Sequence, residues 1–364
     1  MNSEHTKAIL LINLGSPDST KVSDVKKYLD EFLMDERVID FDYWKRWLLV
    51  RGIILNFRPR KSAAAYKSIW WEEGSPLIVL SERLQQKVQQ YTDMPVALAM
   101  RYGNPSIGDV LEKLKVDHPK LEEVRVIPLY PQYAMSTYET VVEKVKEQMA
   151  ARNLDFNLKW VPPFYKRSDY LEVLVNSLRP AVEKGDFDKI LFSYHGVPVR
   201  HVKRGDITGE HCKKCEDCCH TPSEAHTWCY SAQCYAVTKA VCEALEIPEE
   251  KVVHTFQSRL GRDPWLQPYT DKTLEKLGEE KVGKLLVVCP AFVSDCLETL
   301  EEIEEEGKEI FEEAGGGSFT YIPCLNDRDD WAKLLAEWGD DDSVLVKTDA
   351  VTFPITLPVT KRMY

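Results

Sequence analysis

The chain has 364 residues, a length that suits two domains and excludes a peptide, a disulfide knot or a single small module. Apolar residues make up 44% and charged residues 29% of the chain, which allows a normal core and excludes intrinsic disorder. The formal net charge is −12, so the chain repels phosphate backbones and we expect no nucleic-acid partner.

Short apolar, β-branched runs that end in Gly or Pro predict buried parallel strands. They occupy residues 8–17, 96–105, 124–133, 189–198 and 284–292. Charged amphipathic stretches with helical spacing lie between them, among them residues 22–33, 80–91 and 138–152. This alternation predicts a doubly wound α/β fold with parallel sheets.

The two halves of the chain resemble each other. The run 124–133 pairs with 284–292, which sets Glu139 against Glu298, and the first strands of the two halves, AILLINLG and KILFSYHG, pair in the same way. We therefore expect two related domains. Ligands bind beyond the carboxyl ends of parallel strands, so the residues that follow these runs are favoured for function. They are Asn13, Arg101, Tyr133, His195, Asp295 and Glu298.

His195 ends a strand-like run and precedes Gly196. Imidazole can accept or donate a proton near neutrality, or bind a metal as the neutral ring. A histidine that only hydrogen-bonds a neighbouring loop is an equally good interpretation of its position.

The segment 295–313 combines a helical pattern with many acidic residues. On an α-helix, four of them would form one stripe, namely Glu298, Glu302, Glu305 and Glu309. A solvated face is the more common meaning of such a run. Because the run directly follows the strand 284–292, we expect its first carboxylates to face the same crevice as His195, where they suit a hard divalent cation.

Seven of the ten cysteines lie between residues 212 and 242. The pattern C-x2-C-x2-C-C, with another cysteine ten residues on, supplies four thiolates for a [2Fe–2S] cluster or a zinc ion. His211, His220 and His226 are alternative ligands. The opening residues MNSEHTK show no secretory pattern and no apolar stretch approaches the ~20 residues of a membrane span, so we expect a cytoplasmic protein with reduced thiols.

The stretch 41–61 interleaves aromatic and aliphatic residues with six Lys and Arg residues. This composition suits a membrane surface or a flat aromatic ligand that bears carboxylates. A core helix with a basic outer face explains the pattern equally well.

The runs LLINLGSP, FSYHGVP, FQSRLGRDPWLQPYTD, CPAFVSDCLETLEEI and YIPCLND closely resemble the ferrochelatases, which insert ferrous iron into a porphyrin at the last step of protoheme synthesis. The match runs from about residue 6 to about 335. The family's fold implies two similar Rossmann-like domains with the porphyrin cleft between them. We place the first domain at 1–165, with 41–61 as an apolar lip and residues of about 320–364 packing back on it, and the second at 166–320.

The resemblance also implies the roles of individual residues. His195 and Glu298 match the family's iron ligands or proton acceptors, and Glu302 stands behind Glu298. The positions that match porphyrin contacts or lie near the metal path are Asn13, Leu14, Arg101, Tyr102, Tyr133, Ser136, Thr137, Trp265, Phe292 and Asp295. The expected reaction is Fe²⁺ insertion into protoporphyrin IX, with His195 as the base that receives the pyrrole protons.

This chain departs from the plainer bacterial ferrochelatases by a cysteine-rich insertion at 207–234. Some members carry a [2Fe–2S] cluster on an internal segment, and the insertion resembles theirs. We expect the ligands to be four of Cys212, Cys215, Cys218, Cys219 and Cys229. Some branches have a histidine where this chain has Cys296, so a second catalytic histidine is excluded there.

Two alternatives stay open from the sequence. One is a chelatase for another metal or tetrapyrrole, such as cobalt or coproporphyrin III. The other is a non-catalytic iron–sulfur redox sensor. We expect no obligate protein partner, and the apolar lip allows peripheral contact with the inner face of a membrane.

Overall fold

The computed structural model describes residues 5–261 and 263–354. They divide into two compact units. The first unit holds residues 5–129, 134–162 and 327–354, and the second holds residues 130–133 and 163–326 apart from residue 262. Relative to the boundary expected at 165/166, the four residues Tyr130–Tyr133 join the second unit. The end of the tail, residues 355–364, lies outside the described residues.

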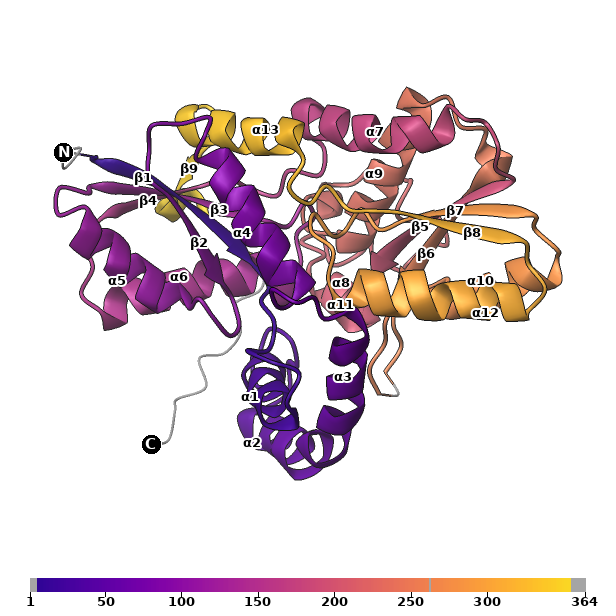
Figure 1. Ribbon diagram of the computed structural model, residues 1–364, viewed down its shortest axis with the longest axis horizontal. Helices are drawn as coiled ribbons and strands as arrows, with labels where there is room; N and C mark the ends of the chain where they lie inside the picture. The colour runs from indigo at the N-terminus through magenta and orange to yellow at the C-terminus, as the bar shows by residue number, and fades with distance from the viewer. Residues whose placement is uncertain (1–4, 262, 355–364) are drawn as a thin grey trace. The chain divides into compact units, whose positions relative to one another are not determined.

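The first unit is built on a five-stranded sheet with the order β2-β1-β3-β4-β9 (Figure 1). The strands β1 (Lys7–Asn13), β2 (Val96–Met100), β3 (Glu123–Pro128) and β4 (Asn157–Trp160) run parallel, and β9 (Val346–Lys347) pairs antiparallel with β4. The side chains of β1 are buried from its second residue to its last, as expected for a parallel strand with helices on both faces.

Helices cover both faces of this sheet. In Figure 1, α4 (Pro76–Val88) and α13 (Asp329–Asp340) lie on one face, and α5 (Ile107–Asp117) and α6 (Thr140–Ala151) lie on the other. A helical arm extends from the unit (Figure 1). It is formed by α1 (Val22–Leu33), α2 (Tyr43–Trp47), π-helix η1 (Leu48–Ile54) and α3 (Leu55–Ile69). The unit also contains the π-helix η2 (Met135–Glu139) and the 3₁₀-helix η6 (Thr348–Ala350).

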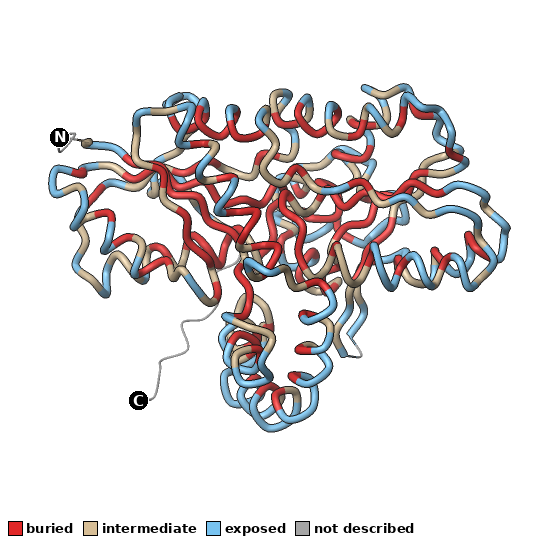
Figure 2. Tube along the Cα trace, in the orientation of Figure 1, coloured by how far each residue is buried: buried red, intermediate tan, exposed pale blue. Residues whose placement is uncertain are grey.

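The second unit repeats this plan with the all-parallel sheet β6-β5-β7-β8. Its strands are β5 (Lys189–His195), β6 (Val252–Gln257), β7 (Lys284–Val288) and β8 (Ser318–Ile322). Figure 2 shows these strands as the buried centre of the unit, with the outer helix faces exposed. The order equals that of the first four strands of the first unit, and β1 and β3 correspond to β5 and β7, as the internal similarity predicts.

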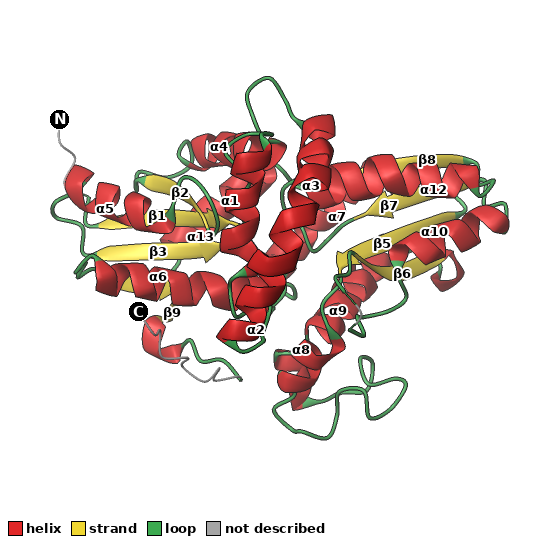
Figure 3. Ribbon diagram, turned by 90° about the horizontal axis from the view of Figure 1, so that it is seen from below, coloured by secondary structure: helices red, strands yellow, loops and turns green. Residues whose placement is uncertain are grey.

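Helices again lie on both faces of the second sheet, with α7 and α9 on one face and α10 and α12 on the other (Figure 1). Their bounds are α7 (Ser168–Val182), α8 (Val199–Arg204), η3 (Glu224–Thr227), α9 (Tyr230–Ala244), η4 (Glu249–Lys251), α10 (Thr270–Glu279), α11 (Leu297–Thr299), π-helix η5 (Leu300–Gly307) and α12 (Lys308–Glu313). Apart from η3, the connection from α8 to α9 is loop and turn (Figure 3). The predicted doubly wound α/β class with two similar domains is confirmed.

The arm of the first unit exposes large apolar side chains. None of the helices formed by residues 5–261 and 263–354 combines the length and apolar composition needed to span a bilayer. The exposed side chains on and beside α2, η1 and α3 are Phe41, Tyr43, Trp44, Trp47, Leu48, Ile53 and Phe57.

Arg125 ties the central strand β3 to the C-terminal part of the first unit. Its side chain is 2% exposed and donates to the Gly339 carbonyl at 2.5 Å and to the Asp342 carboxylate at 2.7 Å. It also pairs with Glu123 at 2.7 Å. A buried guanidinium with this many partners fixes α13 against the sheet.

Replacing Arg125 by methionine should destabilise the chain. Glu123 and the Gly339 carbonyl then lose their buried donor, and breaking a buried pair typically costs about 3 kcal/mol. Chemical denaturation of the purified chain measures this loss. Lys113→Met, which removes an exposed pair with Asp117, is the control and should change stability by less than about 0.5 kcal/mol. Equal effects of the two variants would contradict the role of Arg125.

Candidate functional site

His195 is the last residue of β5, at the carboxyl edge of the second sheet. Its Nδ1 lies 2.6 Å from the carbonyl oxygen of Gly196. A carbonyl only accepts, so the ring carries its proton on Nδ1, and Nε2 of the neutral ring holds the lone pair. The ring is half-buried and its edge meets Phe292, with the ring centres 6.3 Å apart. The geometry thus presents a proton acceptor, or a metal ligand, at the end of a buried strand.

The neighbouring strand β6 ends in Gln257 and continues into Ser258. His195 and Gln257 are register partners in the parallel pair. The Gln257 side chain accepts from the Ser193 hydroxyl at 2.8 Å and donates to the Glu298 carbonyl at 2.6 Å. Ser193 and Gln257 are buried and Glu298 is half-buried, so Gln257 links the interior of the sheet directly to the start of the acidic helix.

Glu302 is the most enclosed acid of the segment that begins at Glu298. Its two carboxylate oxygens accept from the Ser258 N–H at 2.8 Å and from the Ser258 hydroxyl at 2.5 Å. Burial raises the pKa of Glu302, while the Ser258 hydrogen bonds and the charge of His195 act in the opposite direction. The influence of His195 places the imidazole and this carboxyl in one electrostatic environment.

The acidic segment does not form the regular α-helix that its spacing predicts. Leu297–Thr299 and Lys308–Glu313 are α-helical, but Leu300–Gly307 between them is a π-helix, whose hydrogen bonds join residues five apart. The predicted stripe of four carboxylates therefore does not hold. Glu298 and Glu302 are half-buried, whereas Glu305 and Glu309 are exposed.

Asp295 anchors the beginning of this helix. Its carboxylate accepts from the Tyr321 hydroxyl and the Asn326 amide, each at 2.6 Å, and from the Thr299 hydroxyl at 3.0 Å. The residue is 4% exposed. These donors occupy the carboxylate, so Asp295 stabilises the helix start and has almost no surface for a ligand.

Trp265 and Phe292 are the half-buried aromatic residues of this edge. The Trp265 indole donates to the Leu260 carbonyl at 3.0 Å. A Cβ at Gly196 would lie 3.4 Å from the Trp265 ring, so this ring packs beside the turn that follows His195.

The other candidate residues follow β1, β2 and β3, and all of them belong to the first unit except Tyr133, which belongs to the second. The Asn13 side chain donates to the Ser81 hydroxyl and accepts from the Leu14 N–H, and the Tyr102 N–H binds the Leu14 carbonyl. Asn13 is 5% exposed, whereas Leu14 is half-buried. These bonds hold together the loops that follow β1 and β2.

Asp35 organises Arg101 and Tyr102. Its carboxylate accepts from the Arg101 guanidinium, the Thr140 hydroxyl and, at 2.9 Å, the Tyr102 hydroxyl. Burial acts to raise the pKa of Asp35, but Arg101 and these hydrogen bonds outweigh it and hold the pKa below its usual value. Tyr102 is fully buried, so its ring supports Arg101 from within the fold.

The candidates after β3 differ in accessibility. Ser136 and Thr137, in η2, are partly exposed. Tyr133 is 3% exposed, and its N–H donates to the Gln233 side chain at 2.7 Å. Its ring packs edge-to-face with Trp228, with the ring centres 4.9 Å apart.

The cysteine-rich connection between α8 and α9 is organised by Asp206 and by contacts among its thiols. The Asp206 carboxylate accepts from the backbone N–H groups of His211 and Cys212 at 2.8 and 2.7 Å. Hydrogen bonding from Cys229 lowers the pKa of Cys212, and the same contact raises the pKa of Cys229 to about 12.

Four of the five predicted ligand cysteines share this environment. Cys219 is also hydrogen-bonded to Cys229, and the charges of Cys218 and Cys219 both act on Cys212. Cys215 is exposed. No group of three or more His, Cys, Asp or Glu side chains within residues 5–261 and 263–354 has an arrangement that could hold a metal ion. The thiols are thus neighbours without forming a ready ligand shell.

The histidines of this connection have other partners. His211 and His226 each place Nε2 within 2.8 Å of the Cys218 carbonyl. His220 contacts the Tyr235 ring, which stacks at 3.8 Å on His254 of β6. This contact joins the segment to the second sheet.

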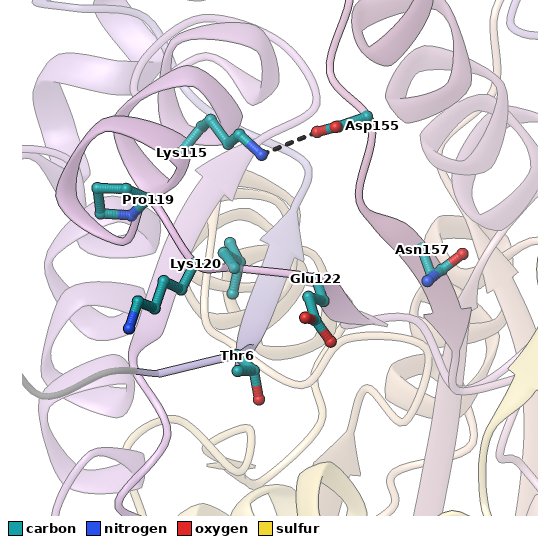
Figure 4. A pocket seen from close by; sticks show the side chains of 8 residues that line it. Thr6, Lys115, Pro119, Lys120, Glu122, Asp155 and Asn157 are labelled. Carbon is teal, nitrogen blue, oxygen red and sulfur yellow. Dashed lines mark hydrogen bonds and ion pairs between the residues drawn. The ribbon is translucent and has the colours of Figure 1, made fainter.

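A cavity of about 430 Å³ in the first unit lies away from all these residues (Figure 4). It is lined from the amino ends of β1, β3 and β4, with Thr6, Glu122 and Asn157 beside the Lys115–Asp155 ion pair. Ligands of parallel α/β sheets bind at the opposite, carboxyl edge. None of the candidate residues lines this cavity.

The family model for ferrochelatase matches residues 6–341 of the chain. The chain belongs to the ferrochelatase family. Ferrochelatases of Pseudomonas fluorescens strains SBW25 and Pf0-1 are 52% and 51% identical to it, each alignment covering 90% of this chain and 96% of the relative. The ferrochelatase of Pseudomonas entomophila is 50% identical over 90% of this chain and 97% of the relative.

A solved structure described as SirB from Bacillus subtilis with Fe³⁺ shares the fold, with a TM-score of 0.52 and 11% identity. The comparison covers 93% of this chain and 97% of that one. At this identity the likeness concerns the fold alone. It agrees with the two Rossmann-like halves of this chain.

Sequence reasoning missed Asp35, Gln257 and Ser258, which hold the candidate residues in place. Ser258 lies within the quoted run FQSRLGRDPWLQPYTD, but its type and spacing carry no chemical signal. Its partner Glu302 is 44 residues away in the sequence, so the contact exists only in the folded chain.

His254 should make the stability of the chain depend on pH. Burial and the nearby His220 lower the pKa of His254 to about 3, and its Nε2 has no hydrogen-bond partner among the described residues. The unfolded chain takes up a proton at this residue below about pH 6.5, whereas the folded chain does not. Stability is therefore lost as the pH falls below 6.5, by about 2 kcal/mol at pH 5.

Denaturant unfolding at pH 7 and pH 5 measures this loss in the parent chain and in His254→Phe. Phenylalanine keeps the stack with Tyr235 but cannot titrate. The difference in the free energy of unfolding between pH 7 and pH 5 should therefore be smaller in His254→Phe by about 2 kcal/mol. His118→Phe, at a half-buried histidine of the first unit, is the control. An unchanged difference in His254→Phe would contradict the role of His254.

Proposed function

We propose that this chain catalyses the insertion of Fe²⁺ into protoporphyrin IX to form protoheme, with His195, Glu298 and Glu302 as its proton and metal handling groups. As a member of the ferrochelatase family it is an enzyme, a lyase of heme biosynthesis. The observation that carries the residue assignment is the grouping of His195, Ser258 and Glu302 at one edge of the second sheet.

His195 is the base that receives the pyrrole protons. A free-base porphyrin holds two N–H protons, which must leave before four nitrogens can bind a metal. The Nδ1–H bond to the Gly196 carbonyl fixes the ring and leaves Nε2 as the acceptor. After protonation, the imidazolium is stabilised by the Gly196 carbonyl and by the negative charge of Glu302.

Glu298 and Glu302 supply oxygen atoms, which hard divalent cations prefer. Glu302 is enclosed and its pKa is raised, so it takes up a proton more readily than a surface carboxyl. The pair can hold Fe²⁺ on its way to the porphyrin or carry away the protons that His195 receives. Fe²⁺ is the substrate of this reaction.

The remaining candidates bind or support the porphyrin. Trp265 and Phe292 present apolar rings beside His195, as a flat substrate requires, and a ring held out of plane would favour the transition state over the substrate. Arg101 is the cation that we propose for a porphyrin carboxylate. Partly exposed Leu14, Ser136 and Thr137 are proposed contacts, whereas the buried side chains Asn13, Tyr102, Tyr133 and Asp295 act by holding their neighbours.

We further propose that the cysteine-rich segment holds a [2Fe–2S] cluster through Cys212, Cys218, Cys219 and Cys229. The mutual influence of these four thiols supports the choice, and the exposure of Cys215 argues against it as the fourth ligand. Such a cluster would accept or donate single electrons and cross-link the loop. The proton and metal steps above use only His195 and the glutamates.

The arm residues 41–61 are proposed as a lip that contacts a membrane from the cytoplasmic side. Trp44 and Phe57 are 64% and 78% exposed, and Lys45 and Arg51 lie among such side chains. Exposed aromatics with basic neighbours suit an interface between water and anionic lipid, where a poorly soluble porphyrin also partitions.

Replacing His195 by alanine should lower kcat at least 100-fold, because general-base catalysis contributes that much or more. The assay is anaerobic incubation with protoporphyrin IX and Fe²⁺, followed by the change from the porphyrin to the heme spectrum. His118→Ala is the matched control and should keep full activity. Full activity of His195→Ala would overturn the base assignment, and an inactive parent chain that accepts Co²⁺ or coproporphyrin III would overturn the substrate assignment.

The anaerobically purified chain should contain about two irons outside the substrate site and absorb visible light. Cys219→Ser should lose both properties, because the cluster then lacks a ligand, and Cys215→Ser should keep them. Metal analysis and absorption spectra check both variants. Zinc without iron in the parent chain would contradict the cluster.

A further inference from the structure

Ser258 adopts a backbone conformation that serine rarely takes. Its φ is +58°, in the left-handed region that favours glycine. The residue directly follows β6, where the chain turns away from the sheet edge beside His195. A residue held in a disfavoured conformation next to a candidate site points to a contact that requires it.

That contact is with Glu302. The N–H and the hydroxyl of Ser258 bind the two different oxygens of the Glu302 carboxylate, at 2.8 and 2.5 Å. Glycine would fit the backbone better and would keep the N–H bond, but it has no hydroxyl for the second oxygen. The serine hydroxyl therefore adds a second hydrogen bond, and the two bonds together fix the orientation of the carboxylate plane.

The same turn is packed against the residue that follows His195. The Gly196 N–H donates to the Gln257 carbonyl at 2.6 Å. A Cβ at Gly196 would lie 2.8 Å from the Ser258 carbonyl oxygen, closer than a side chain allows. Glycine is required at 196 by this close approach, and Ser258 is thus held between the His195 turn and Glu302.

We propose that Ser258 is a positioning residue of the chelatase reaction, which orients the Glu302 carboxylate toward His195 so that protons or iron pass between them. This inference rests on the role proposed for Glu302. Gln257 acts one residue earlier, on the Glu298 carbonyl, so two consecutive residues hold two successive turns of the acidic helix.

The test compares Ser258→Gly with Ser258→Thr in the full-length chain. Glycine relieves the left-handed strain but removes the hydroxyl, so Tm should stay or rise while kcat falls about tenfold, the usual effect of losing a hydrogen bond to a charged group. Threonine keeps the hydroxyl in a conformation that β-branching disfavours, so Tm should fall while kcat stays within about threefold of the parent value. The KM for protoporphyrin IX should not change in either variant.

Glu246→Gly is the matched control. Glu246 is an exposed residue of the same unit with a φ of +52°, so its replacement also relieves left-handed strain, but it should leave kcat unchanged. If kcat follows Tm in the two Ser258 variants, the residue is only structural and the inference is wrong.

Glu302→Ala separates this inference from the function proposed above. An active parent chain with an impaired Glu302→Ala and a fully active Ser258→Gly would overturn the role of Ser258 alone. Full activity of Glu302→Ala would overturn the role of Glu302 and the inference that rests on it. An inactive parent chain would overturn the proposed reaction itself.

Discussion

The register between β5 and β6 is the constraint on which the candidate site depends. It sets His195 beside Gln257 at the carboxyl edge of a parallel sheet, and the chain that continues from each strand meets the other there. This pairing allows three sets of hydrogen bonds. The Gly196 N–H donates to the Gln257 carbonyl, the Gln257 side chain donates to the Glu298 carbonyl, and Ser258 donates to the Glu302 carboxylate. A shift of one residue would turn His195 into the sheet face and separate these groups.

Burial of acidic groups is compensated in two different ways at this edge. Transfer of a carboxylate from water into the protein costs several kcal/mol of free energy, and each hydrogen bond to the charged group offsets about 1.5 to 3 kcal/mol of this cost. Asp295 accepts from three side chains and serves as a fixed support. Within the part of the chain that the structure describes, the Glu302 carboxylate accepts hydrogen bonds from Ser258 alone, and its raised pKa reflects the incomplete compensation. The less compensated carboxyl is the one suited to exchange protons.

The two halves share a plan but differ in what their acids do. Glu139, which the internal similarity aligns with Glu298, is 1% exposed and paired with Arg37 at 3.0 Å. A neutralised carboxylate of this kind is unsuited to bind a second cation. The order β2-β1-β3-β4 is thus repeated as β6-β5-β7-β8, whereas the aligned acids Glu139 and Glu298 differ in burial.

Much of the fold could be predicted from the sequence because its signals are local. Apolar runs closed by Gly or Pro marked β1, β2, β3, β5 and β7, and helical spacing marked α1 at its actual limits, Val22–Leu33. The ferrochelatase motifs, the position of His195 at the end of a strand and the cysteine spacing could likewise be recognised in the sequence. These features depend on residue types at short separations, where periodicity and motif carry the information.

Tertiary structure alone decided how the candidate residues are held. The π-helix at Leu300–Gly307 broke the predicted stripe of carboxylates, since spacing along the chain does not reveal whether a helix closes its bonds over four or five residues. Asp35 reaches Arg101 across 66 positions and Ser258 reaches Glu302 across 44. Contacts at such separations form only when strands and loops meet in space, so no local pattern determines them.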